Sequence, residues 1–215
     1  MTGTLIFDWD GTLHNTASLY GGAFRAAYDT LVQAGHMPPR YYSDEEMSAY
    51  LGMNGPDMWH SFAPQLPEPV WRAASAVVTS EMARRVREGQ AVLYPGTEQT
   101  LARLRDMGYH MVILSNCVHG YLQAHREVFR LDRFFEGYYA CQDYGFAPKE
   151  EIFSDIAAKH PGDFVMIGDR ASDMKVGQTH GLKTVFCRYG FGKEEEGAGA
   201  WAAADSITQM PDILA

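Results

Sequence analysis

The period of the hydrophobic pattern changes early in the chain. A short apolar run over residues 5–7 leads into two acidic residues, Asp8 and Asp10, and is typical of a buried strand. From residue 16 to about residue 88, apolar positions recur at helical spacing, and no segment there has a convincing strand pattern. We therefore predict that a helical insertion follows the first strand.

From Pro95 onward, helical and strand patterns alternate. They predict helices over 97–107, 118–129, 150–159 and 172–180, and strands over 110–114, 137–140, 164–167 and 184–187. Such alternation is typical of a parallel sheet covered by helices. We predict an α/β fold with a Rossmann-like sheet, with a core of residues 1–14 and 89–215 and an inserted α-helical cap of residues 15–88 over the sheet edge. Residues 190–204 are expected to form a loop or a partly ordered helix.

Three segments of the insertion carry sequence signals for a helix start, a helix and a turn. Ser43, followed by three acidic residues, resembles a helix N-cap, and residues 67–87 read as a helix with basic residues near its end. Residues 51–57 contain two glycines, Asn54 and Pro56, which predict a turn between helices rather than a helix.

Composition narrows the class of protein. The 215-residue chain is 46% hydrophobic, which predicts a globular core, and its formal net charge of −9 argues against nucleic acid or an anionic membrane as a partner. We find no apolar run long enough to cross a bilayer and no signal-peptide pattern, so a cytoplasmic location is expected. Cys117, Cys141 and Cys187 form no C-x-x-C pair, and we expect reduced thiols.

The first candidate site is the acidic pair after the first strand. In an extended segment, side chains two residues apart share a face, so Asp8 and Asp10 point the same way and Trp9 points the other way. Gly11 then breaks the strand, and open α/β sheets bind ligands at the carboxyl ends of their strands. The pair suits a metal ion and a phosphate. Taken alone, two aspartates before Gly-Thr are as well explained as turn formers.

Two further candidates precede predicted helices. Ser115 and Asn116 end the second strand, where a hydroxyl and free N–H groups suit a phosphate, although a simple helix cap is favoured for this pair alone. Lys149 stands where the helix dipole favours anions, and it would bring positive charge to a phosphate and to crowded carboxylates. A solvated surface lysine is the commoner alternative.

A third candidate is more specific. Asp169 follows an apolar strand and a glycine, and Asp173 falls in the first turn of the next helix, where complementing the helix dipole would be its simplest role. Asp8 and Asp169 both lie at predicted strand ends, so adjacent parallel strands would bring their carboxylates together. Repulsion between them calls for a cation, and oxygen ligands suit Mg²⁺.

These motifs, in this order, resemble the haloacid dehalogenase-like hydrolases, in particular the phosphoglycolate phosphatase-like branch with a helical cap. The resemblance covers essentially the whole chain, with residues 8–12 similar to the first family motif, Ser115 and Asn116 to the second, Lys149 to the third, and residues 168–173 to the fourth. The sequence departs from the pattern at Trp9 and at the proline before Lys149, and neither change removes a catalytic group.

The resemblance implies a Mg²⁺-dependent phosphatase acting on a small phosphorylated metabolite. Asp8 would attack phosphorus and form an aspartyl phosphate, while Asp10 would act as acid and then as base. The metal ligands would be the Asp8 and Asp169 carboxylates and the Asp10 carbonyl, with Asp173 acting through water or a neighbouring group. The substrate-binding residues implied are Ser115, Asn116 and Lys149, with Thr12 adding a contact and Asn54, in the cap turn, selecting the leaving group.

Alternatives within and outside the family stay open. A dehalogenase would lack the second aspartate, and a phosphonate hydrolase needs a cap lysine that residues 14–88 do not contain. A sugar-phosphate mutase similar to β-phosphoglucomutase usually has a histidine where this chain has Tyr20. A non-catalytic protein that binds phosphorylated metabolites is the alternative from another class. The physiological substrate and the oligomeric state are not predicted.

Overall fold

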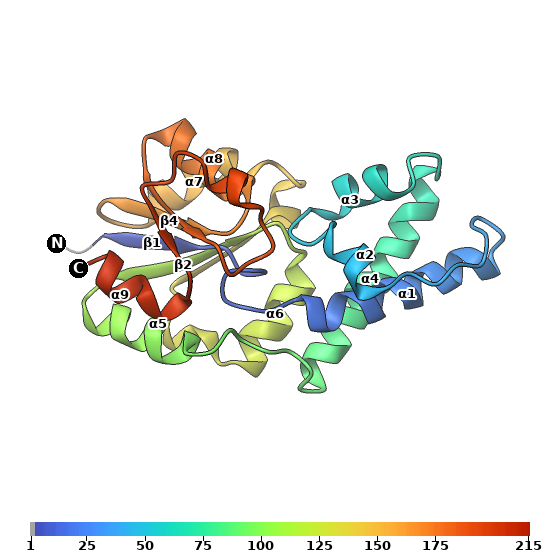
Figure 1. Ribbon diagram of the computed structural model, residues 1–215, viewed down its shortest axis with the longest axis horizontal. Helices are drawn as coiled ribbons and strands as arrows, with labels where there is room; N and C mark the ends of the chain where they lie inside the picture. Colours follow the sequence, from blue (N-terminus) through green and yellow to red (C-terminus); the bar gives the residue numbers. More distant parts are fainter. Residues whose placement is uncertain (1–2) are drawn as a thin grey trace.

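A six-stranded parallel sheet lies at the centre of the computed structural model, which describes residues 3–215 (Figure 1). The strand order is β3-β2-β1-β4-β5-β6. The strands are β1 (Thr4–Phe7), β2 (His110–Ser115), β3 (Gly137–Ala140), β4 (Phe164–Gly168), β5 (Lys183–Cys187) and β6 (Ala202–Ala204). Because β1 lies between β2 and β4, the segments that follow these three strands emerge side by side.

Side chains alternate between the two faces of the sheet, as the pleat requires. Ile6, Val112 and Met166 pack in a cluster with α7 and α8, whereas Phe7 and Ile113 join the larger cluster on the other face. Both faces are covered by helices, so β1 is buried along its whole length. The helices that follow the insertion are α5 (Thr97–Asp106), α6 (His119–Val128), α7 (Lys149–Lys159), α8 (Ala171–His180) and α9 (Met210–Ile213).

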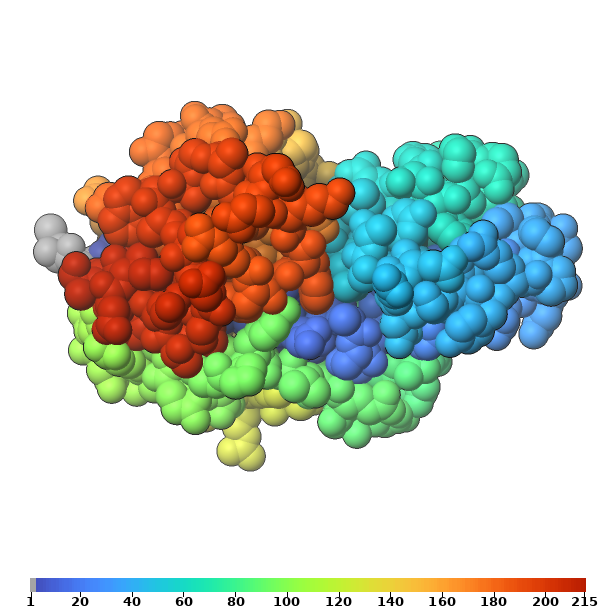
Figure 2. Space-filling view, in the orientation of Figure 1, coloured from blue at the N-terminus to red at the C-terminus, as the bar shows by residue number. Residues whose placement is uncertain are grey.

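The remaining helices project beyond the carboxyl ends of the strands (Figure 1). They are α1 (Ala17–Gln33), α2 (Asp44–Ser48), α3 (Gly55–Phe62) and α4 (Glu68–Arg87), which we call the cap helices. Helix α4 packs against both α1 and α6, so the cap helices lie directly against the rest of the molecule (Figure 2). The division into a core and an inserted cap stays a proposal, which this arrangement supports.

Most predicted elements are confirmed within one or two residues, including the N-cap of α2. There the Ser43 hydroxyl accepts a hydrogen bond from the Glu46 N–H at 3.2 Å, and the Glu46 carboxylate accepts one from the Ser43 N–H at 2.9 Å. The three cysteines are free thiols, as expected. None of the helices in the described part of the chain combines the length and apolar character needed to cross a bilayer.

Two local predictions hold only in part. Residues 190–201 form a loop with a short 3-10 helix over Glu194–Gly197, as expected, but the segment ends in β6. The pattern does not reveal this strand of three alanines because alanine has little strand preference. Residues 51–54 form the expected turn between α2 and α3, whereas residues 55–57 are helical, since α3 begins at Gly55. Asn54 supplies the N-cap of α3 and Pro56 stands in its first turn, where a missing N–H costs nothing.

Candidate active site

Lys149 lies buried between two carboxylates. It is the first residue of α7, and its Nζ donates to Asp8 Oδ1 at 2.7 Å and to Asp173 Oδ1 at 2.6 Å. Burial alone lowers the pKa of a lysine, but the charges of Asp173 and Asp8 outweigh burial and raise the pKa of Lys149. The ammonium therefore stays charged next to Asp8, and the interpretation of Lys149 as a solvated surface residue is excluded.

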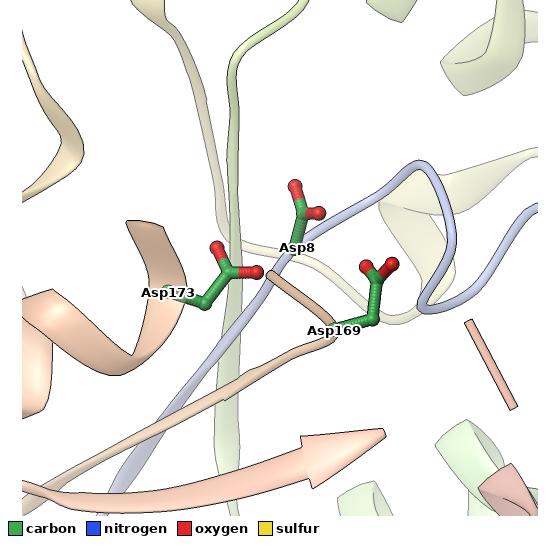
Figure 3. A group of neighbouring side chains, drawn as sticks. All are labelled: Asp8, Asp169 and Asp173. Carbon is green, nitrogen blue, oxygen red and sulfur yellow. The ribbon is translucent and has the colours of Figure 1, made fainter. Parts of the chain in front are cut away.

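Asp8, Asp169 and Asp173 form a buried acidic group. One carboxylate oxygen of each lies within 4.8 Å of the others, and the side chains converge from the ends of β1 and β4 and the start of α8 (Figure 3). Burial, together with the charges of Asp173 and Asp169, raises the pKa of Asp8 well above its usual range despite Lys149. Burial and Asp173 raise the pKa of Asp169 to about 7. Three carboxylates face one ammonium, and this excess of negative charge favours a bound cation.

Two loops hold Asp169 in place. The Thr12 hydroxyl donates to Asp169 Oδ1 at 3.1 Å, and the Phe191 N–H donates to Oδ2 at 2.8 Å. Gly11 has a φ of 87°, and a Cβ there would lie 2.3 Å from Asp169 Oδ2, so this position needs glycine for both conformation and space. The structure therefore places the Thr12 hydroxyl on a carboxylate, and its predicted contact with substrate stays a prediction.

Asp173 has both carboxylate oxygens engaged. Its Oδ2 accepts a hydrogen bond from the Arg170 N–H at 2.9 Å, at the start of α8, while its Oδ1 accepts from Lys149. Asp173 thus complements the dipole of α8, as the sequence suggested, and in addition it holds the ammonium of Lys149. Such a residue is suited to support a metal site indirectly.

Asp10 is held by three polar side chains that the sequence analysis did not single out. Tyr121 Oη donates to Asp10 Oδ1 at 2.8 Å, the Thr16 hydroxyl donates to the same oxygen, and His14 Nδ1 lies 3.2 Å from it. Burial pushes the pKa of Asp10 upward, but the hydrogen bond and charge of His14 outweigh burial and lower it. Asp10 is therefore oriented as a carboxylate at the mouth of the site.

An uncharged histidine lies behind this network. His125 is fully buried on α6, and neither of its ring nitrogens has a hydrogen-bond partner among the described residues. Its ring centroid lies 4.4 Å from that of His14 and 5.0 Å from that of Trp9. Burial and the charge of His14 lower the pKa of His125 well below its usual value, although Asp10 opposes the shift.

We expect this buried imidazole to make stability fall in mild acid. An unfolded histidine has a pKa of about 6.5, so below that pH the unfolded chain binds a proton that folded His125 does not. The stabilisation is complete above about pH 6.5 and is lost as the pH falls toward the lower folded pKa. In His125→Leu, the free energy of unfolding, measured by urea denaturation, should depend less steeply on pH between about 7 and 5.

The exposed residue His36 provides the control, and His36→Gln should keep the wild-type slope. Identical slopes for His125→Leu and the wild type would show that another group, among those facing the ring, governs the acid response. The titratable side chains that face it are His14, Asp10 and Tyr121.

A cavity of about 100 Å³ separates these carboxylates from the cap helices. Asp8, Asp10, Ser115 and Asn116 line it from the sheet side, so four of the predicted site residues meet there. Ser115 is buried at the end of β2, where its Oγ accepts from the Cys117 N–H at 3.3 Å. The cavity is thus a space in which a phosphoryl group would touch both candidate catalytic aspartates.

The cap turn meets this site through its backbone. Asn116 Nδ2 donates to the Gly52 carbonyl at 3.0 Å, and the Arg170 guanidinium donates to the Leu51 carbonyl. Asn54 does not line the cavity, because its side chain accepts from the Asp57 N–H at 2.9 Å and caps α3. A direct role of Asn54 in substrate choice stays a prediction, and its neighbours in the turn are better placed.

The comparisons with known proteins agree with this geometry. The family model described as haloacid dehalogenase-like hydrolase matches residues 2–181. The chain belongs to this family. The resemblance found in the motifs is thereby confirmed, and with it the place of the chain among the haloacid dehalogenase-like hydrolases.

Relatives of this family member match along its whole length. The pyrophosphatase PpaX of Halalkalibacterium halodurans is 25% identical over 98% of this chain and 94% of its own. A predicted phosphatase from Clostridium acetobutylicum has a TM-score of 0.84 at 21% identity, covering 100% of this chain and 99% of that one. A predicted phosphoglycolate phosphatase from Haemophilus somnus has a TM-score of 0.75 at 17% identity, covering 100% and 98%. The structural matches establish the fold.

Proposed function

We propose that this protein is a Mg²⁺-dependent phosphatase that hydrolyses a small phosphomonoester. The observation that carries the proposal is the position of Asp8, which lines the cavity together with Asp10 and accepts a hydrogen bond from the buried Lys149 at 2.7 Å. The candidate nucleophile and the candidate acid–base group thus share one space, and a buried ammonium contacts the nucleophile. The named activities of the relatives, a pyrophosphatase and phosphatases, belong to the same class of reaction.

The chemistry proceeds in two steps. Asp10, a carboxylate in the free protein, must first take up a proton from solvent. Asp8 then attacks phosphorus, the bond to the ester oxygen breaks, and Asp10 gives that proton to the oxygen, so the alcohol leaves and an aspartyl phosphate remains. Asp10, now a carboxylate, takes a proton from water, which attacks phosphorus and releases phosphate from Asp8. The hydrogen bonds from Tyr121 and Thr16 fix the orientation of Asp10 for both transfers.

The transferring phosphoryl group needs positive charge and donors around it. Lys149, the Ser115 hydroxyl and the Asn116 backbone are the groups we assign to it, because phosphoryl transfer depends mainly on positioning and charge stabilisation. Lys149 is already in place, since its contacts with Asp8 and Asp173 hold the ammonium before any substrate arrives. Such preorganisation avoids the cost of reorienting the charge during the reaction.

The residues present fit Mg²⁺. The Asp8 and Asp169 carboxylates and the Asp10 carbonyl would hold it, with Asp173 supporting through water, and the excess of buried carboxylates over Lys149 supplies the electrostatic reason. When bound, the ion would supply positive charge to the nucleophile and to the phosphate. We propose the cytoplasm as the place where this chemistry occurs, and a small phosphorylated metabolite as the partner.

Phosphate release from a generic aryl phosphate tests the proposal. We expect release with Mg²⁺ and its loss when EDTA is added, whereas binding without turnover would favour the non-catalytic alternative. Conversion of a sugar phosphate into its isomer without net release would favour a mutase.

Asp169→Asn tests the metal site. We expect it to raise the Mg²⁺ concentration needed for half-maximal activity by about tenfold or more, because one carboxylate ligand is lost. The exposed Asp29→Asn serves as the control and should leave the titration unchanged. A wild-type titration for Asp169→Asn would remove Asp169 from the set of metal ligands.

A further inference from the structure

The cap side of the cavity is apolar. Leu51, Met58, Val78 and Met82 line it opposite Asp8 and Asp10, and all four are buried. The polar groups that the cap helices add to this wall are hydroxyls, those of Ser75 and Thr79 on α4 and of the tyrosines nearby. A leaving group bound here would therefore meet methyl, methylene and hydroxyl groups.

Within residues 3–215, the cavity wall contains no lysine, arginine or histidine. The basic side chains that contact its lining already face carboxylates: Arg170 pairs with Glu196 at 3.0 Å, and His14 Nδ1 lies 3.2 Å from Asp10 Oδ1. Lys149 already faces two carboxylates. The site thus has charge for one phosphoryl group and none for a second anion.

A second negative charge in this cavity would be costly. It would lose its hydration among apolar side chains, without a counter-charge and within reach of Asp8 and Asp10. A carboxylate, as in phosphoglycolate, or a second phosphate, as in pyrophosphate, would bear this cost. An uncharged leaving group of the same size would instead gain from apolar burial.

Tyr20 adds a specific feature to the same wall. Its side chain is 9% exposed, and its hydroxyl has no hydrogen-bond partner among the described residues although it is buried. Buried hydroxyls almost always have a partner, so this one has an unused capacity beside the cavity that it lines. A hydroxyl or carbonyl oxygen on the ligand would satisfy it.

We infer that the substrate is a phosphomonoester of a compact, uncharged and mainly apolar alcohol that carries one further oxygen for the Tyr20 hydroxyl. The inference rests on the proposed phosphatase function and names the substrate class of that site. Water and the ester yield the free alcohol and inorganic phosphate. The cap thereby selects against the anionic substrates that the names of two relatives indicate for those proteins.

A matched set of esters tests this. Hydroxybutyl phosphate, butyl phosphate, carboxypropyl phosphate, phosphoglycolate and pyrophosphate are compared by phosphate release with Mg²⁺. We expect kcat/KM for hydroxybutyl phosphate to exceed that for each anionic substrate by about tenfold or more. Tyr20→Phe should lower kcat/KM about tenfold for hydroxybutyl phosphate and leave that for butyl phosphate nearly unchanged.

A gain of function gives an independent measurement. Thr79→Lys adds an ammonium to the wall, and it should raise the ratio of kcat/KM for carboxypropyl phosphate to that for butyl phosphate by about tenfold. Ser80→Lys, on the exposed side of the same helix, is the matched control and should leave the ratio at its wild-type value. An unchanged ratio in Thr79→Lys would show that charge in this wall does not govern selection.

The outcomes distinguish failure of the substrate-class inference from failure of the proposed phosphatase function. Higher kcat/KM for carboxypropyl phosphate, phosphoglycolate or pyrophosphate than for the uncharged esters would overturn the inference and leave the phosphatase function standing. Absence of phosphate release from every compound, the generic aryl phosphate included, would overturn the proposed function and the inference with it. Equal losses on butyl and hydroxybutyl phosphate in Tyr20→Phe would remove Tyr20 from leaving-group recognition.

Discussion

Asp8→Asn should reduce turnover by roughly 10⁴-fold or more while the protein stays folded, because an amide cannot form the aspartyl phosphate and loss of a nucleophile costs on this order. The substitution is nearly isosteric, and the amide oxygen can still accept the hydrogen bond that Lys149 gives to Asp8. Steady-state phosphate release and circular dichroism measure the two properties.

A radiolabelled substrate makes the test sharper. Acid-quenched wild-type protein should carry the labelled phosphoryl group, and Asp8→Asn should not. The exposed Asp106→Asn is the matched control and should behave like the wild type in both assays. Full activity of a folded Asp8→Asn protein would disprove the role of Asp8.

Lys149→Met should lower kcat by about 10²- to 10³-fold, because a preorganised charge next to the transferring group is lost. Methionine has a similar length, so it fills the space without the charge. Removing one partner of a buried ion pair costs about 3–5 kcal/mol, and here it leaves Asp8 and Asp173 facing each other. We therefore expect a lower melting temperature, partly restored by Mg²⁺.

Lys159→Met, ten residues further along α7, is the control. Lys159 is exposed and pairs with Asp155 at 2.8 Å, so its loss should change neither kcat nor the melting temperature appreciably. If both substitutions had equal and small effects on kcat, Lys149 would have no part in catalysis. Thermal unfolding measured alongside activity separates lost chemistry from lost folding.

The parallel sheet was predictable because its information is local. The three central strands β1, β2 and β4 are short, mainly apolar runs, and polar residues mark their ends: Asp8, Ser115 and Asp169. Once β1 lies between β2 and β4, these ends must converge, so the acidic group follows from the pattern together with the rules of parallel topology. The strand β6 was not predicted, because three alanines carry no such signal.

The surroundings of Asp10 were not predictable in the same way. His14 and Thr16 follow Asp10 closely, and a polar cluster so near an acidic pair was an available signal. Tyr121 gave none, because it lies on α6, 111 residues further along the chain, and meets Asp10 only through the fold. Which residues line the cavity likewise depends on how α1 and α4 pack. Helical periodicity does not specify this packing.

The backbone contacts that hold the cap turn leave the side chain at one of its two anchoring positions free to change. Asn116 and Arg170, each next to a residue of the site, hold the turn by the carbonyls of Gly52 and Leu51. Every amino acid has such a carbonyl, so a substitution of Leu51 can alter the wall of the cavity without removing the group that anchors it. Gly52 is different, because its φ is 82° and a Cβ there would lie 3.0 Å from Arg170 Cγ, so this position favours glycine. Evolution can therefore exchange one substrate for another at this turn while the reaction machinery beneath it is inherited intact.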